Sequence, residues 1–109
     1  MRSDCPISAV LDIFGDKWTL LVVRDIVINQ RHKFNEFAAM GEGIPTNILA
    51  DRLKRLVEYG IVEKRPYQQR PTRYEYHLTR KGEDLIPIIH DMIRWGLKHV
   101  PGTGASKGY

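Results

Sequence analysis

The side chains best suited to recognising a ligand lie along a predicted helix from Thr46 to about Tyr59. At about 100° per residue, Leu49, Leu53 and Leu56 fall on one face, which predicts packing against a core. The rest of this helix carries polar and charged side chains, namely Thr46, Asn47, Asp51, Arg52, Lys54 and Arg55. Asparagine can pair with the edge of adenine, and arginine or lysine with guanine or with phosphate. The pattern favours a helix that reads bases in a DNA major groove, with an ordinary solvated helix face as the alternative.

A second polar group surrounds a proline-bounded loop that we expect at 66–72. The segments on either side, 61–65 and 73–78, have the composition of strands. The loop and its edges present amide and guanidinium groups from Gln69, Arg70 and Arg73. Arginine on an extended loop is attracted into the minor groove of DNA. We therefore predict a two-stranded wing that contacts DNA, with a solvated hairpin tip as the alternative.

Residue types that would support catalysis or hold a cofactor are poorly placed. The four histidines and Cys5 lack the spacing of metal ligands. The glycines at 41 and 43 have neither the third glycine nor the preceding strand of a phosphate-binding loop. No nucleophile is paired with a base. We expect no enzyme activity, no metal and no cofactor.

Four helices are expected before the wing, each bounded by a capping residue, glycine or proline. They are 6–14, capped by Asp4; 17–27, capped by Asp16; 34–40; and 46–59. The second is apolar on nearly every side, which is typical of a buried helix at the centre of a domain. The third and fourth are joined by a glycine turn, and this order is that of a helix-turn-helix.

After the wing, Thr79 is expected to cap a long last helix, 80–100, with a bend at Pro87. Its apolar residues cover an arc of roughly 200°, whereas a helix that packs only on its own core needs roughly 100°. The excess predicts a homodimer, unless the helix folds back and buries both faces within one subunit. We expect the dimer interface to use residues of the first and last helices, namely Leu11, Phe14, Ile86, Ile89, Met92 and Ile93.

The composition fits one small domain. The chain has 109 residues, 42% of them hydrophobic, and a net charge of +4, which is compatible with a polyanionic partner. A single cysteine excludes an intrachain disulfide, and neither a signal peptide nor a membrane span is evident. We expect a cytoplasmic protein of mainly α (α+β) class, with a winged helix-turn-helix domain at 1–100, N- and C-terminal dimerisation helices, and an unstructured tail at 101–109.

Short segments in a fixed order resemble the HxlR-type family of transcriptional regulators. They are Cys5-Pro6, Gly15–Trp18, Phe34–Phe37, Ile44–Leu53, Tyr59–Val62, Tyr74–Thr79 with Gly82, and Trp95-Gly96. The resemblance implies a winged-helix homodimer that binds double-stranded operator DNA and represses more often than it activates. It implies no catalysis. Two recognition helices related by a two-fold axis predict a near-palindromic operator.

Some members of that family sense oxidants or electrophiles through the cysteine that corresponds to Cys5. Such chemistry needs an accessible thiolate, which positive potential from Arg2, Lys17 or a helix N-terminus would favour. A disulfide of this single cysteine would join two subunits or take up a small thiol, and a small molecule or oxidant would be the effector. The alternative is that Cys5 only packs beside the first helix.

A winged-helix domain that binds a protein instead of DNA is the second functional hypothesis, because a fold does not determine a function. An interaction wing should be apolar or acidic. The wing of this chain is basic, which favours DNA.

Overall fold

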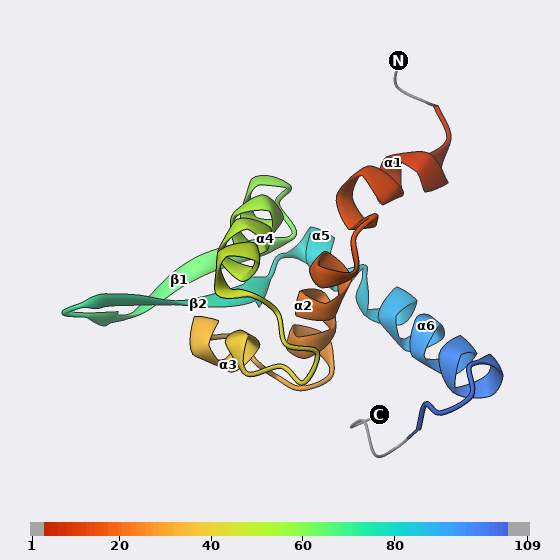
Figure 1. Ribbon diagram of the computed structural model, residues 1–109. Coiled ribbons are helices and arrows are strands. Elements are labelled where there is room, and N and C mark those ends of the chain that lie inside the picture. Colours follow the sequence, from red (N-terminus) through yellow and green to blue (C-terminus); the bar gives the residue numbers. More distant parts are fainter. Residues whose placement is uncertain (1–3, 105–109) are drawn as a thin grey trace.

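The computed structural model describes residues 4–104. A helix-turn-helix is followed by a hairpin, and further helices precede and follow these two motifs (Figure 1). In Figure 1 the hairpin extends to one side of the molecule, and the first and last helices lie on the other. The elements are α1 Pro6–Phe14, α2 Lys17–Val27, α3 Phe34–Ala38, α4 Thr46–Glu58, β1 Val62–Gln69, β2 Thr72–Leu78, α5 Arg80–Glu83 and α6 Ile86–His99.

The core is built around α2, as its sequence predicts. Val22 and Val23 of this helix are fully buried, and helices α1, α3, α4 and α6 and strand β1 contribute further buried apolar side chains to the core. The leucine face of α4 packs inward, with Leu49, Leu53 and Leu56 at most 1% exposed. Burial of these side chains fixes α4 in rotation, so its polar residues are left on the outside.

The N-terminal caps of the first two helices differ. The Asp16 carboxylate accepts hydrogen bonds from the backbone N–H groups of Trp18 and Thr19, at 3.1 and 3.2 Å, and this confirms the predicted cap of α2. The expected cap of α1 by Asp4 is wrong. Cys5 occupies that position without a side-chain cap, and Pro6 begins the helix because it needs no N–H partner there.

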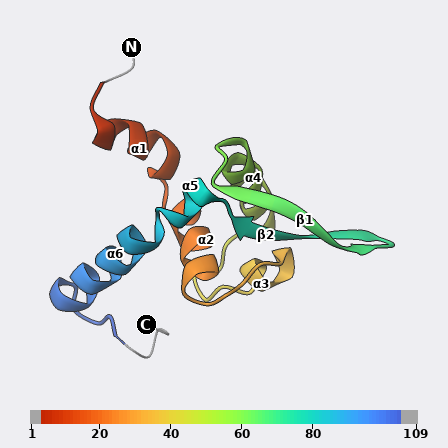
Figure 2. The ribbon, with the colours of Figure 1, turned by 180° about the vertical axis from the view of Figure 1, so that it is seen from behind.

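The hairpin is longer than its sequence predicts. The antiparallel ladder runs from Val62↔Leu78 to Gln69↔Thr72, so most of the expected loop is strand and only Arg70 and Pro71 form the turn. The ladder passes Pro66 because each strand of a two-stranded sheet has a free edge, and its register shifts between Pro66 and Gln68. Figure 2 shows the resulting extended wing from behind.

The expected long last helix is two helices. Thr79 caps the first, α5, because its side chain accepts a hydrogen bond from the N–H of Gly82 at 3.1 Å. The chain then turns at 84–85, and Pro87 lies in the first turn of α6, so the expected bend at Pro87 is wrong. A side chain at Gly82 would overlap the carbonyl oxygen of Ile61, so only glycine allows α5 to approach this residue, which directly precedes β1, so closely.

The beginning of the tail is ordered against α6. The Thr103 hydroxyl donates to the carbonyl oxygens of Gly96 and Val100, at 3.1 and 2.8 Å, in a turn after the helix. The rest of the expected unstructured segment, 105–109, lies outside the described residues, as does Arg2.

Candidate nucleic-acid interface

The N-terminal end of α4 lies on the surface next to a tight turn. The N–H of Gly43 donates to the Met40 carbonyl oxygen at 3.1 Å, and Gly43 has a φ of +75°, which favours glycine. Pro45 precedes the helix and supplies no side-chain cap. Thr46 and Asn47 are exposed in the first turn of α4, where the recognition helix of such a motif meets base edges.

The next turns of α4 combine acidic and basic groups. Asp51 and Lys54 are exposed, and Arg55 is partly exposed. The guanidinium of Arg55 lies 3.9 Å from the Asp51 carboxylate, one helical turn away. Lys54 and Arg55 therefore lie at the surface of the helix whose first turn exposes Asn47.

Arg52 is also a predicted DNA-binding residue, but its guanidinium forms ion pairs within the protein. Its Nε donates to the Asp16 carboxylate at 2.9 Å, and its Nη1 donates to Asp51. Its side chain is 19% exposed. Burial disfavours the charged form of Asp16, but hydrogen bonds from Arg52 and Thr19 outweigh it and lower the pKa of Asp16 to about 2. Arg52 therefore connects α4 to α2 in this structure.

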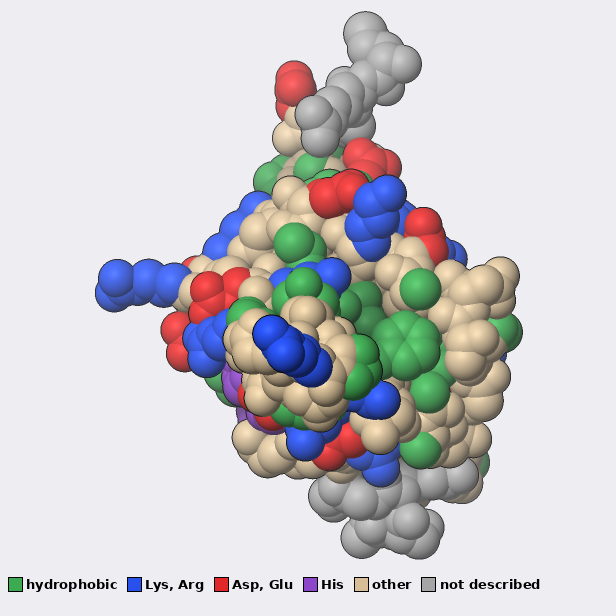
Figure 3. Space-filling view, turned by 90° about the vertical axis from the view of Figure 1, so that its left-hand side faces the viewer, with side chains coloured by type: hydrophobic (Ala, Val, Ile, Leu, Met, Phe, Trp, Pro, Cys, Tyr) green, Lys and Arg blue, Asp and Glu red, His purple; other side chains and the backbone are tan. Residues whose placement is uncertain are grey.

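The tip of the wing carries the predicted amide and guanidinium groups. Gln69, Arg70 and Arg73 are all exposed. The Gln68 side chain donates to the Pro71 carbonyl oxygen at 3.2 Å, and the Thr72 hydroxyl donates to that of Gln69 at 3.1 Å. These contacts order the tip from within. Figure 3 looks at the molecule from the side of the wing and shows basic side chains over its end.

Two further lysines, Lys33 and Lys64, extend the basic surface of the wing and are not among the residues predicted from the sequence. The ammonium group of Lys33 lies 4.6 Å from the ring centre of Tyr67, and that of Lys64 lies 4.2 Å from the ring centre of Tyr74. Lys33 reaches the wing from the segment before α3, and Lys64 of β1 lies against Tyr74 of the neighbouring strand β2. The sequence carries no local signal for these pairs, because Lys33 and Tyr67 are far apart in the chain and the pairing of Lys64 with Tyr74 depends on the strand register.

A pair of stacked histidines fixes the base of the wing to the helix-turn-helix. The rings of His32 and His77 lie 4.1 Å apart at 16°. The N–H of Tyr76 donates to the His32 carbonyl oxygen at 2.7 Å, and an isolated bridge pairs Lys33 with Glu75. The segment before α3 therefore pairs with β2, so the orientation of the wing follows that of α3 and α4.

Helices α1 and α6 lie on the side of the molecule away from the wing (Figures 1 and 2), and both carry exposed apolar side chains. Leu11 is 56% exposed and Met92 is 51% exposed, and both belong to the predicted dimer interface. Ile86 and Ile93 are half-buried. Further exposed apolar side chains on these two helices are Ile7, Val10, Ile88, Trp95 and Leu97.

Two residues of that predicted interface are core residues of the subunit. Phe14 is 8% exposed and Ile89 is 4% exposed, and both belong to the central cluster of buried residues. The helical period placed them on the correct side of their helices. It did not show that α2 covers that side within the same chain.

Cys5 is exposed at the N-terminal end of α1. Its carbonyl oxygen accepts the first hydrogen bond of the helix, from Ala9 at 3.0 Å. The ammonium group of Lys17 lies 4.5 Å from the ring centre of Trp18. Among the described residues, no three histidine, cysteine or carboxylate side chains are placed to hold a metal ion. No helix within 4–104 has the length and apolar character needed to cross a membrane.

Sequence comparison identifies relatives along most of the chain. Residues 13–103 match a family described as HxlR-like helix-turn-helix. An uncharacterised HTH-type transcriptional regulator of Mycobacterium tuberculosis is 37% identical over 95 residues, which are 87% of this chain and 59% of that protein. The chain thus spans about three fifths of the length of this relative.

Solved structures of two similar proteins, one of them in two forms, share the fold. A Porphyromonas gingivalis protein described as a MarR-family transcriptional regulator has a TM-score of 0.80 and 33% identity, over 92% of this chain and 97% of that one. The redox regulator HypR in its reduced form has a TM-score of 0.77 and 33% identity, over 89% and 95%. The oxidised form of HypR has a TM-score of 0.75 and 35% identity, over 87% and 97%.

Proposed function

The chain belongs to the HxlR-like helix-turn-helix family, and from this premise we propose that it binds operator DNA sequence-specifically and represses transcription. The observation that carries the proposal is the outward polar face of α4 beside an extended basic wing. The leucines that hold α4 are buried, while Asn47, Lys54 and the wing residue Arg70 are exposed. A helix and a wing fixed together in this way can enter adjacent grooves of one duplex.

The residues divide into base readers and backbone binders. Thr46, Asn47 and Asp51 face base edges in the major groove. The cationic and amide groups of Lys54, Arg55, Gln69, Arg70 and Arg73 bind phosphates or the minor groove. Arg52 supports this surface from within, because its ion pair with Asp16 holds α4 against α2.

We propose that the protein acts as a homodimer. The exposed apolar faces of α1 and α6, with Leu11, Met92 and Trp95, are the surface that a second copy covers. A two-fold axis there relates two copies of α4, whose major grooves lie about 34 Å apart on one side of the duplex. The operator is then a near-palindrome.

We also propose an oxidant-sensitive role for Cys5. The thiol is exposed at the start of α1, which lies in the proposed dimer surface. A relative of the same fold, HypR, is described as a redox regulator and has been solved in reduced and oxidised forms. Oxidation of Cys5 would form a disulfide with a second subunit or with a small thiol, and each disulfide passes two electrons to the oxidant.

Selection of bound duplexes from a random DNA pool tests the central proposal and returns the operator. We expect enrichment of a sequence with two related halves. A variant that combines Asn47→Ala with Arg70→Ala serves as the control and should enrich nothing. If the wild-type protein enriches no sequence, DNA recognition is contradicted, and protein binding becomes the favoured function.

A further inference from the structure

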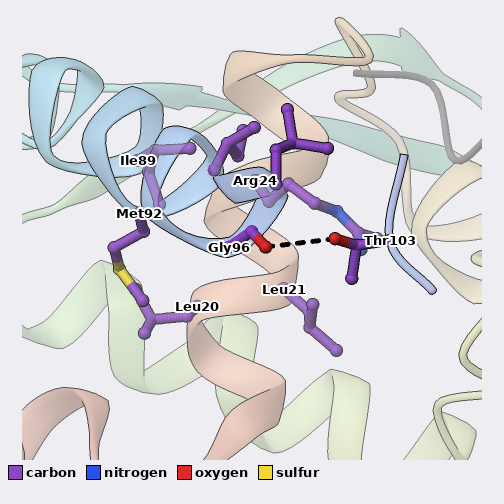
Figure 4. A pocket seen from close by; sticks show the side chains of 9 residues that line it. Leu20, Leu21, Arg24, Ile89, Met92, Gly96 and Thr103 are labelled. Carbon is purple, nitrogen blue, oxygen red and sulfur yellow. Dashed lines mark hydrogen bonds between the residues drawn. The ribbon is translucent and has the colours of Figure 1, made fainter. Parts of the chain in front are cut away.

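A groove between α2 and α6 is apolar except at one side. It has a volume of about 210 Å³ and is lined by apolar side chains that include Leu20, Leu21, Ile89 and Met92, the last of which also belongs to the proposed dimer surface. Gly96 and Thr103, which are joined by a hydrogen bond, also line the groove. Figure 4 shows the Arg24 side chain entering among these residues, on the side of Thr103.

Arg24 brings a positive charge to this apolar groove. Its side chain is 10% exposed and makes two carboxylate contacts on different edges of the guanidinium. Nε and Nη2 donate to Asp25 at 3.2 and 2.8 Å, while Nη1 and Nη2 donate to Glu42 at 2.6 and 2.9 Å. The outer edge, with the two terminal nitrogens, is thus the edge that Glu42 occupies.

The two carboxylates differ in how easily they can leave. The Asp25 side chain is fully buried and also accepts hydrogen bonds from Asn29 and Arg31, at 2.9 and 3.3 Å. The Glu42 side chain is 38% exposed and lies in the turn before α4, so it can rotate into water. A carboxylate that replaces Glu42 on Arg24 leaves the charge of this cluster unchanged, which avoids an unpaired buried guanidinium.

We propose that this groove binds a small organic acid, with its apolar body between α2 and α6 and its carboxylate on the outer edge of Arg24 in place of Glu42. Arginine binds a carboxylate in a planar two-point contact, which suits this edge. The volume suits a ligand with a single ring, since an apolar cavity of about 150 Å³ accommodates benzene. An organic acid with an apolar body is the expected ligand class because the guanidinium of Arg24 lies beside a groove that is otherwise apolar.

Binding of the acid releases a link between the groove and the helix-turn-helix. Glu42 lies in the turn that leads to Thr46, and its contact with Arg24 ties this turn to α2. Displacement of Glu42 frees the turn and lowers the affinity of α4 for operator DNA. This second step depends on the proposed function, whereas binding of the acid does not.

Calorimetric titration with 3-phenylpropanoate tests the site in the absence of DNA. The neutral 3-phenylpropanamide has nearly the same shape and should bind about tenfold more weakly, because it lacks the charge-assisted contact. Glu42→Gln removes the competing charge and should tighten binding of the acid by about tenfold, while binding of the amide changes little. Equal affinities for acid and amide, or no binding of the acid, would overturn the proposal.

Gly96→Leu tests the location of the site. A Cβ at Gly96 meets nothing within 4 Å, so the helix accepts a side chain there, and leucine fills the groove. Arg94→Leu is the matched control, since Arg94 lies on nearly the opposite side of α6 and its side chain is 75% exposed. We expect Gly96→Leu to abolish binding and Arg94→Leu to preserve it. Retained binding in a folded Gly96→Leu protein would place the acid elsewhere and contradict the proposal.

The effect on DNA is measured separately, by anisotropy of a labelled operator with and without 3-phenylpropanoate. We expect the acid to weaken operator binding by wild-type protein and to leave the Gly96→Leu protein unaffected. Calorimetric binding without any change in operator affinity would overturn the regulatory step alone. A failure of the wild-type protein to bind any DNA would contradict the proposed function and leave the calorimetric test of the groove intact.

Discussion

The Nε of Arg52, in the middle of α4, donates to the carboxylate of Asp16 at 2.9 Å, and Asp16 is also the N-cap of α2. One carboxylate therefore stabilises the start of the central helix and holds the proposed recognition helix against it. Both side chains are mostly buried, with 19% of Arg52 and 28% of Asp16 exposed. An ion pair that is shielded in this way contributes more than an exposed surface pair.

Replacement of Asp16 by Asn should weaken the protein in a pH-dependent way. The folded pKa of about 2 lies below the ordinary value of 3.8, so the stabilisation is present above 3.8 and is lost as the pH falls through about 2. Asparagine can still cap a helix, so Asp16→Asn isolates the charge and should cost about 1 kcal/mol at neutral pH. Urea unfolding measured between pH 7 and pH 2 checks this.

Asp91→Asn is the matched control for that experiment. Asp91 pairs with Arg94 at 2.7 Å, but both side chains are at least two-thirds exposed, so its loss should change the free energy of unfolding little. Equal losses in the two variants at neutral pH would contradict a special role for the pair of Arg52 with Asp16.

Asn47→Ala should reduce sequence preference. The side chain is exposed in the first turn of α4, whereas the leucine face of this helix is buried. Loss of a two-point contact with adenine should weaken binding to the selected operator by about 1–3 kcal/mol and relax the preference at one position in each half. Anisotropy titrations against operators altered at single positions provide the measurement, and unchanged preference at every position would exclude Asn47 as a base reader.

Arg70→Ala should act differently from Asn47→Ala. Arg70 is exposed at the turn of the wing, so its loss should weaken binding to all sequences by a similar factor. The magnitude of the slope of log affinity against log salt concentration should fall by about one, which corresponds to the loss of one phosphate contact. Arg65→Ala is a useful control, because Arg65 is also exposed on the wing but its guanidinium pairs with Glu63. A salt slope that is the same for wild type and Arg70→Ala would contradict phosphate or minor-groove binding by Arg70.

The residues whose roles depended on periodicity were predictable, and those that depended on tertiary contacts were not. The inward face of Leu49, Leu53 and Leu56 follows from spacing along one helix. The ion pair of Arg52 does not, because its partner Asp16 lies 36 residues earlier in the chain. The stacked pair of His32 and His77 was missed for the same reason.

The wing and the last helix were only partly predicted because proline occurs in edge strands and in the first turn of helices as well as in loops and bends. Pro66 and Pro71 suggested a loop, yet Pro66 lies in a strand with a free edge and only Pro71 lies in the turn. Pro87 suggested a bend, yet it stands in the first turn of a new helix. Composition identified the elements, and the pairing of strands and helices fixed their ends.

Oxidation should alter DNA binding through Cys5. Diamide takes two hydrogens from a pair of thiols and leaves a disulfide, either between two copies of Cys5 or between Cys5 and an added small thiol. We expect treated wild-type protein to show a changed operator affinity and Cys5→Ser to show none. Mass spectrometry under non-reducing conditions distinguishes the two products. A Cys5 that stays unmodified, or a response that persists in Cys5→Ser, would leave this residue no sensory role.

Separation of the proposed dimer should require changes on the exposed face of α6 and not in its core. Ile89 is buried, so Ile89→Asp would unfold the subunit and reveal nothing about assembly. Met92 and Trp95 are 51% and 63% exposed, and the double variant Met92→Asp, Trp95→Asp places two charges where a second copy should pack. Sedimentation velocity at tens of micromolar should then show monomers with the circular dichroism of the folded protein.

The control for assembly is Arg94→Asp on the polar side of the same helix, which should remain a dimer because Arg94 is 75% exposed and pairs there with Asp91. Monomers should bind the near-palindromic operator much more weakly than the dimer, since the affinity of two linked recognition helices exceeds that of one. Their affinity for a single half-site should fall far less, because α4 and the wing lie on the other side of the molecule. A wild-type protein that sediments as a monomer, or a double variant that remains a dimer, would contradict the proposed interface of α1 and α6.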